Sequence, residues 1–397
     1  MKKLLLLFCL CSPFCFAQAD FTRVYYPIIN EAELAIVDTS YYEALQFYNE
    51  AFANVQRPFA KDYYNAAICA TMVGKMPLVF EYLEKIVEKG YKVTNFRKDA
   101  FFKNVADTCK KWPDFEKQVL LIEPAINRQV RDSLQKIKQQ QFVYHVAPIT
   151  ADLRNYYKPY LKNFKWVPVD SLIHLPDMPK NLVAQQDSLR LINAKIATAN
   201  TYNRIQRTLS IIDLNGYPDE NMIGLNSPLP EGSPYTFNAT ASYLLQNTLL
   251  PDIFQEKANR IDILSVVKQA IRDGKADPHI LKSLIEYSTD EPYTMGKVLV
   301  LQLRLENNID CPNENWQQKK EQFFWKKERP STMTEIEINE KRLAIGLEKL
   351  EDAYKKAFFK ARNTPFLILG GTYLAELAYI PSCELIDKTI SGTVMLK

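Results

Sequence analysis

The chain has 397 residues, of which only 11 are glycines, and it carries 50 basic and 46 acidic side chains. Such a low glycine content, against about 7% in an average chain, favours helices over the turns that sheets require. The nearly balanced charge argues against a nucleic-acid-binding protein, because clustered positive charge drives that binding. The length allows two or three domains.

Residues 1–17 have the pattern of a secretory signal peptide. The basic start Lys2-Lys3 precedes an apolar run over residues 4–10, Pro13 breaks this run, and Ala17 offers a small residue for cleavage. The run is much shorter than the roughly 20 residues that span a bilayer. We therefore expect a bacterial protein that is released into the periplasm or secreted. A buried N-terminal helix is the alternative.

Two further ways of joining a membrane are also disfavoured by the sequence. Lipid attachment would need small residues directly before a cysteine, and Cys9, Cys11 and Cys15 all lack them. After the signal peptide, the longest apolar stretch is residues 364–380, which Glu376 and a pair of glycines interrupt. We expect neither a lipid anchor nor a transmembrane segment in the mature protein.

Four cysteines follow the signal peptide, and an exported location permits disulfides. Their spacing favours a bond between Cys69 and Cys109 and another between Cys311 and Cys383. Buried free thiols are the alternative, since cysteine packs as a small hydrophobic residue. The sequence leaves this choice open.

Residues 18–115 are predicted to form tetratricopeptide-like helical repeats. Apolar residues recur at helical spacing over residues 41–56, 62–74 and 77–90, which gives helical hairpins with a period of about 34 residues. The Trp-Leu-Gly signature of such repeats is missing, so an irregular helical bundle is the alternative. The aromatic-rich residues 91–115 are predicted to cover the open end of the stack.

The rest of the chain is also predicted to be mainly helical. Residues 116–180 form a connecting segment, with a polar helix over 125–141 and an ordered stretch rich in proline and aromatic residues after it. Residues 181–363 form an irregular helical domain, and residues 364–397 a C-terminal segment with a strand at 389–396 in a small β-hairpin. The predicted helices of the helical domain cover residues 181–197, 200–214, 239–249, 252–273, 278–288, 294–306 and 332–361. The last of these begins with a capping box of Thr332 and Glu335.

Motifs that carry chemistry are not found. The three histidines, His145, His174 and His279, stand apart from any metal-ligand spacing, and neither a hydrolase elbow nor a phosphate-binding loop occurs. We therefore expect neither a metal nor a cofactor. Residues 213–220 superficially resemble a calcium loop but fit a helix end and a turn on Gly216 and Pro218 better. Residues 319–329 alternate basic and aromatic side chains, which indicates an amphipathic helix or, alternatively, contact with an anionic surface.

Several short motifs, taken in order, resemble one family of exported bacterial proteins. In the front half they are Tyr64-Asn65-Ala66-Ala67, residues 80–86, Gly90-Tyr91 and residues 112–115, and in the back half they are Gly216-Tyr217-Pro218, Ile223-Gly224, Gly274–Asp277 and Asn339–Leu347. Members of that family carry a tetratricopeptide-like repeat followed by a domain of unknown function. The chain departs from the family pattern at polar positions: Gln246-Asn247 replaces a Gln-His pair, and Glu286-Tyr287 replaces an Asp-Arg pair.

Two functions are compatible with this pattern. The first is a non-enzymatic role in binding a protein or peptide, or as a scaffold, in the periplasm or at the cell surface, because the grooves of helical repeats commonly hold such partners. The alternative is a divergent enzyme, such as a hydrolase, with a pocket in the back half. The polar family positions place that pocket near Gln246, Asn247, Glu286 and Tyr293.

Overall fold

The computed structural model describes residues 19–141, 150–158, 178–225, 263–288, 297–305, 323–328, 332–361, 365–368, 373–380 and 394–395. The chain divides into two compact units. The first contains residues 1–126, 218–242 and 264–397, and the second contains residues 127–217 and 243–263. The described chain is mainly helical, which confirms the predicted fold class. None of its described helices is both long and apolar enough to cross a membrane.

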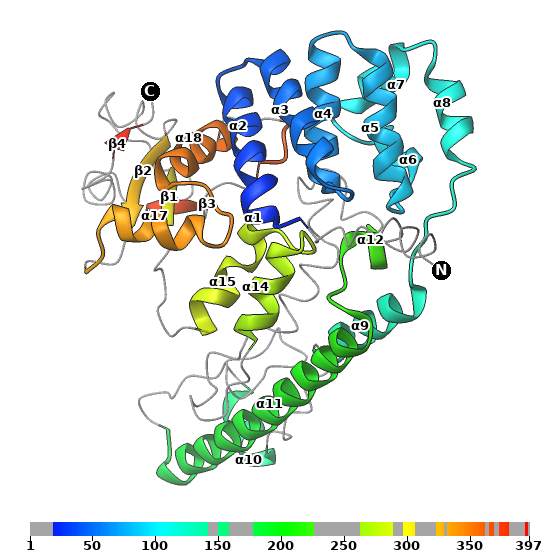
Figure 1. Cartoon of the computed structure of the whole chain (residues 1–397). Coiled ribbons are helices and arrows are strands. Elements are labelled where there is room, and N and C mark those ends of the chain that lie inside the picture. The colour runs from blue at the N-terminus through cyan, green and yellow to red at the C-terminus, as the bar shows by residue number, and fades with distance from the viewer. Residues whose placement is uncertain are drawn as a thin grey trace, which may run out of the picture. The chain divides into compact units, whose positions relative to one another are not determined.

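The first unit begins with a stack of short helices (Figure 1). In chain order these are α1 (Phe21–Val24), α2 (Tyr26–Val37), α3 (Tyr41–Asn54), α4 (Ala60–Met72), α5 (Met76–Glu88), α6 (Val93–Phe96), α7 (Phe102–Thr108) and α8 (Trp112–Val119). Helix α3 packs on α2 and α4, and α4 packs on α5. Alanines on the buried faces, such as Ala44, Ala51 and Ala67, are fully buried and allow the helices to approach closely.

Three helices of this stack, α3, α5 and α8, are linked by contacts between residues about one predicted period apart. Helices α3, α5 and α8 begin at residues 41, 76 and 112. The Tyr82 hydroxyl on α5 donates to Asn49 Oδ1 on α3 at 2.5 Å, and the Gln118 amide on α8 donates to Glu84 Oε2 on α5 at 3.2 Å. The Phe80 and Phe115 rings stack with centroids 4.9 Å apart. The packing of the front helices is therefore repeat-like.

The remaining described helices of the first unit are α12 (Glu220–Ile223), α14 (Leu264–Arg272), α15 (Pro278–Ser288), α17 (Glu335–Leu343) and α18 (Leu350–Ala361). The single helix expected over 332–361 is thus two helices. Its break contains Gly346, which has a φ of 81°, and the buried Arg342 side chain donates across it to the Glu348 carbonyl at 2.6 Å. The capping box exists but lies two residues later, at Thr334 and Glu337, because only there do side chain and backbone bond reciprocally.

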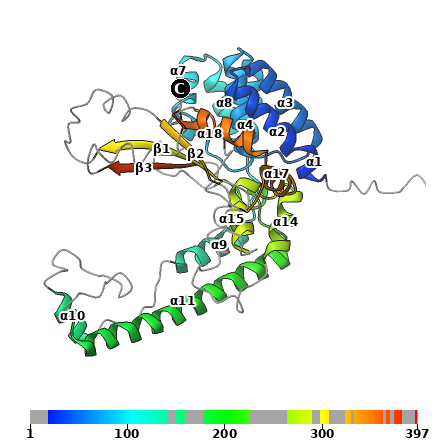
Figure 2. The same cartoon turned by 90° about the vertical axis from the view of Figure 1, so that its left-hand side faces the viewer.

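A four-stranded sheet completes the first unit, in the order β3-β1-β2-β4. Figure 2 shows β1, β2 and β3 of this sheet. Strand β1 (Lys297–Leu305) is antiparallel to β2 (Phe323–Glu328) and parallel to β3 (Tyr373–Ile380), and β2 is antiparallel to β4 (Val394–Met395). The helix predicted at 294–306 is therefore wrong, as is the amphipathic-helix interpretation of 319–329 over its central residues. A continuous Val-Leu run suits a buried strand as well as a helix, and periodicity alone does not separate the two.

The C-terminal strand is present, but its pairing differs from the expected small hairpin. Val394 and Met395 pair with Trp325 and Phe324 of β2, about 70 residues earlier. No short-range hairpin is seen among the described strands. The pairing partner of a strand depends on the whole sheet, so the sequence of a two-residue strand does not identify the strand with which it pairs.

The second unit is built on a long helix. It contains α9 (Arg128–Gln141), α10 (Ala151–Tyr157) and α11 (Lys180–Asn215). Helix α11 is continuous where two helices were expected, because no glycine or proline lies between residues 197 and 200 to break it. A core of Leu153, Tyr157, Met178, Leu182 and Leu189 joins α10 to α11. Gly216, with a φ of 77°, ends α11, which confirms the expected helix end and turn.

Of the two alternatives for Cys69 and Cys109, the disulfide is wrong, because both residues are free thiols. Cys69 is buried in α4, where burial raises the pKa of its thiol to about 12. The alternative of a buried free thiol is thus correct for Cys69, whereas Cys109 is only half-buried. Cys311 and Cys383 lie outside the described residues.

Replacing Gly346 by alanine tests the helix break. A Cβ atom there would overlap the Tyr26 ring, whose hydroxyl is held by the carbonyls of Ala276 and Ile271 at 2.9 and 3.1 Å. We expect a loss of about 3 kcal/mol in unfolding free energy, from the left-handed backbone and the overpacking together. Urea unfolding followed by tryptophan fluorescence measures it.

Gly74→Ala is the matched control for this substitution. Gly74 has a similar φ of 72°, but nothing lies within 4 Å of the position that a Cβ atom would take. We expect this variant to lose only about 1 kcal/mol, the backbone contribution alone. Equal losses in the two variants would contradict the role assigned to the Tyr26 contact.

Candidate functional site

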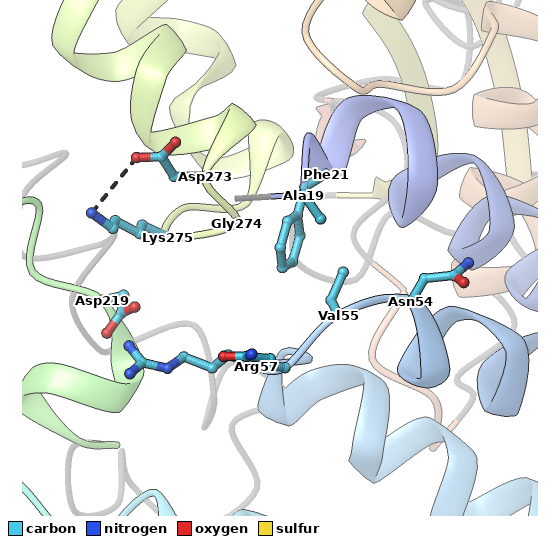
Figure 3. A pocket seen from close by; sticks show the side chains of 10 residues that line it. Ala19, Phe21, Asn54, Val55, Arg57, Asp219, Asp273, Gly274 and Lys275 are labelled. Atoms are coloured by element: carbon cyan, nitrogen blue, oxygen red, sulfur yellow. Dashed lines mark ion pairs between the residues drawn. The ribbon is translucent and has the colours of Figure 1, made fainter. Parts of the chain in front are cut away.

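The first unit contains a pocket of about 440 Å³ where four short segments meet (Figure 3). These are the start of α1, the loop that follows α3, the residue that caps α12, and the turn between α14 and α15. The lining residues are Ala19, Phe21, Asn54, Val55, Gln56, Arg57, Asp219, Asp273, Gly274 and Lys275. All four segments are helix ends or loops, and the lining residues range from the buried Phe21 and Asp219 to the exposed Gln56 and Arg57.

The apolar wall of the pocket depends on a close contact between Phe21 and Gly274. Gly274 has a φ of 65°, and a Cβ atom there would overlap the Phe21 ring. Glycine is therefore required both for the turn and for the ring. Asp20 caps α1 by accepting the Thr22 amide at 3.0 Å, which fixes the chain just before Phe21.

Four charged side chains line the pocket, and three of them are already engaged. Asp273 pairs with Lys275 at 3.6 Å and accepts the Gln269 amide at 2.7 Å. Asp219 caps α12 by accepting the Met222 amide at 2.7 Å. Figure 3 shows the Arg57 guanidinium on the Asp219 side of the pocket, but within the described residues it forms no ion pair.

Behind Phe21 lies a cluster of aromatic rings that connects the pocket wall to the interior. The Phe21 ring centroid lies 4.9 Å from that of Tyr25 and 6.2 Å from that of Phe59. The Tyr25 hydroxyl donates to Asp62 Oδ2 at 2.7 Å and accepts the Phe59 amide at 3.1 Å. A displaced Phe21 ring would therefore disturb both the pocket wall and a buried hydrogen bond.

Asp62 belongs to a buried ion-pair network centred on Lys61. The Lys61 ammonium lies 2.7 Å from Asp62 Oδ1, 3.6 Å from Glu33 Oε1 and 3.5 Å from Asp277 Oδ2. Burial alone would lower the pKa of Lys61, but the three carboxylates raise it above its ordinary value. Burial raises the pKa of Asp62 to about 6 even beside this cation. Lys61 therefore stays charged and joins α2, α4 and the start of α15.

The network continues through His279. Its Nδ1 lies 2.9 Å from Asp277 Oδ1 and its Nε2 2.6 Å from Glu348 Oε2. Burial alone would lower the pKa of His279, but Glu348 and Asp277 raise it to about 9. Burial would likewise raise the pKa of Asp277, whereas Lys61 and His279 lower it to about 2. His279 is therefore held as an imidazolium between two carboxylates.

Two further cations join the network. Lys356 on α18 contacts Glu33 Oε2 at 2.6 Å, and Arg342 on α17 contacts Glu348 Oε1 at 2.9 Å. With His279 protonated, the four cations (Lys61, His279, Arg342 and Lys356) balance the four carboxylates (Glu33, Asp62, Asp277 and Glu348) that these contacts link within the described residues. A buried network that is neutral and fully paired stabilises packing, whereas a buried charge without a partner would be costly.

Motif residues of the back half have structural roles at this network. Asp277 and Arg342 are two of its ions, Gly274 and Gly346 admit the Phe21 and Tyr26 rings, and the Asn339 side chain accepts the Leu350 amide at 2.9 Å. In the front half, the Asn65 side chain bonds the Leu367 backbone in both directions, at 2.8 and 3.1 Å. The motif residues named here therefore pack against a ring, form an ion pair or bond the backbone in this structure.

The site predicted for an enzyme stays a prediction, because most of its residues are not among those that the structure describes. Gln246, Asn247 and Tyr293 lie outside the described residues. Glu286 lies in α15 and is buried, with 8% of its surface exposed. The pocket residues themselves were missed. Arg57 stands in a loop without any motif. Asp273 and Lys275 flank Gly274, which was noted only as part of the family resemblance and not as part of a pocket.

No family model, curated protein or solved structure matches this chain. Among the described residues, no group of three or more His, Cys, Asp or Glu side chains is arranged to hold a metal ion. The case for function therefore rests on the pocket and on the helices around it.

Removing the central cation tests the network. Lys61→Met leaves Asp62, Glu33 and Asp277 buried without their shared partner, so we expect a loss of about 3–5 kcal/mol in unfolding free energy. Lys85→Met removes an exposed ion pair with Glu88 and is the matched control, with an expected change of less than about 1 kcal/mol. Similar melting temperatures for the two variants would show that the network does not stabilise the fold.

The raised pKa of His279 makes a prediction about pH. An imidazolium with a pKa of about 9, against an ordinary value of 6.5, adds stability that is complete below pH 6.5 and lost as the pH rises through 9. The stability difference between the natural protein and His279→Gln should therefore shrink over this range, by up to roughly 3 kcal/mol. Urea unfolding at several pH values between 6 and 10 measures it, and a constant difference would refute the assignment.

Proposed function

We propose that this chain is an exported, non-enzymatic binding protein that holds a segment of a partner polypeptide at the pocket beside Phe21 and Arg57. The single observation behind this proposal is the pocket itself, which combines an apolar wall, a ring of polar groups and one guanidinium without an ion-pair partner among the described residues. Its volume of about 440 Å³ lies within the usual range of ligand sites.

The front helices support a polypeptide as the ligand. Helices α3, α5 and α8 recur with the spacing that is typical of tetratricopeptide-like repeats, and stacks of this kind commonly present a surface to a peptide or partner helix. The last residue of α3 and the loop that follows it supply four of the lining residues, Asn54 to Arg57. A partner that lies along the helices would thus reach the pocket without leaving the first unit.

The state of the charged groups favours binding over catalysis. Asp219 and Asp273 are occupied in a helix cap and an ion pair, and His279 is enclosed between two carboxylates. A general base must present a free lone pair to its substrate. The alternative of a divergent hydrolase rests on Gln246, Asn247, Glu286 and Tyr293, and no observation on the described residues favours it.

Site-specific crosslinking in intact cells tests the proposal. A photoreactive benzoylphenylalanine at Gln56, which is exposed and lines the pocket, should form a crosslink to a specific polypeptide that mass spectrometry identifies. The same residue at Ile336, which is 72% exposed on α17 and does not line the pocket, is the matched control. If Gln56 gives no product that is absent from the Ile336 variant, the pocket does not bind a polypeptide.

A further inference from the structure

We infer that the pocket recognises the C-terminal carboxylate of a polypeptide whose last residue is apolar. This inference rests on the proposed function and adds the chemical class of the ligand. It follows from three observations: Arg57 forms no ion pair with any residue that the structure describes, its guanidinium is a planar group of donors, and apolar residues lie beside it.

The unengaged charge of the pocket is positive. Asp273 is shared between Lys275 at 3.6 Å and the Gln269 amide at 2.7 Å, and Asp219 accepts the Met222 amide at 2.7 Å. Arg57 is exposed and has no ion pair among the described residues. An entering cation would have to compete with these existing bonds, whereas an entering anion finds a donor that is already available.

The chemistry of a guanidinium narrows the kind of anion. Its planar fork of N–H donors matches the two oxygens of a carboxylate, with which it forms paired charge-assisted hydrogen bonds. Asp219 lies on the same side of the pocket as Arg57 in Figure 3, so a compact anion of higher charge, such as phosphate, would also meet this carboxylate. A single negative charge fits these surroundings better.

The surroundings of Arg57 call for an apolar group next to the carboxylate. Val55 lies two residues before Arg57 in the same loop, and Phe21 and Ala19 line the pocket from the start of α1. Burial of an apolar side chain against such a wall is favourable. The last residue of a polypeptide presents a carboxylate and an apolar side chain on one Cα atom, whereas the carboxylate of an Asp or Glu side chain has no second side chain on its own carbon atom.

Calorimetric titration of the mature full-length protein with short peptides tests the inference. The probes are Ac-Ala-Ala-Leu and Ac-Ala-Ala-Phe as free acids, each with its C-terminal amide as the neutral counterpart. We expect each free acid to bind at least about tenfold more tightly than its amide, because the amide lacks the paired charge-assisted bonds. Arg57→Met should abolish this preference, and Arg57→Lys should keep only part of it.

Two further variants separate the possible reasons for a loss of binding. Arg97→Met removes a guanidinium that pairs with Glu116 outside the pocket, and it should leave the preference for free acids unchanged. Val55→Asp places a negative charge beside Arg57 and should weaken the free acids about tenfold or more. Unchanged melting temperatures confirm that each variant is folded.

The outcomes separate this inference from the proposed function. If acid and amide bind equally, or if no free acid binds at millimolar concentration, the carboxylate inference is wrong. In either case a specific crosslink from Gln56 would show that the pocket still binds a polypeptide through an internal segment. If that crosslink is also missing, the proposed function fails together with the inference.

Discussion

The first unit depends on one buried ammonium group. Lys61 is 6% exposed, and a cation at such a position is tolerated only when carboxylates surround it. Its three partners come from α2, α4 and the residue before α15, so the pairing fixes helices that are far apart in the sequence. The same arrangement holds Asp62 for the Tyr25 hydroxyl, and Tyr25 supports the Phe21 ring. The apolar wall of the pocket is thus set by an ion pair in the core.

The helical front was predictable because its signal is local. Apolar spacing, capping residues and glycine positions act within a few turns, and they placed the helices that begin at residues 41, 60 and 76 to within a few residues. The break at Gly346 was missed because the apolar stripe continues through it. The helix ends there because Gly346 has a left-handed backbone conformation, and the Tyr26 ring of α2 packs against this glycine. The strand β1 was missed because a short run of apolar residues is compatible with the period of a helix and with that of a strand.

The network and the pocket were not predictable from one sequence for a different reason. Lys61 and Asp277 are separated by 216 positions, and Glu33 and Lys356 form a hydrogen bond across 323 positions. Nothing local distinguishes these charged residues from the exposed ones around them. The Gly274–Asp277 motif was noted in the sequence. The sequence did not indicate that Gly274 packs against the Phe21 ring or that Asp277 forms an ion pair with Lys61.

The charged residues of the buried network and those of the pocket differ in how many of their charges have a partner, and this difference bears on the proposed function. The charges of the buried network around Lys61 and His279 are matched in number, and each has an ion-pair partner, which favours one geometry for the walls of the pocket. The pocket charges are unevenly engaged, and the guanidinium of Arg57 is left facing solvent. A wall that is rigid before the ligand arrives loses little conformational freedom on binding, which increases affinity. Under the proposed function, the buried network would contribute to recognition without touching the ligand, because it keeps Phe21 in place while Arg57 remains available.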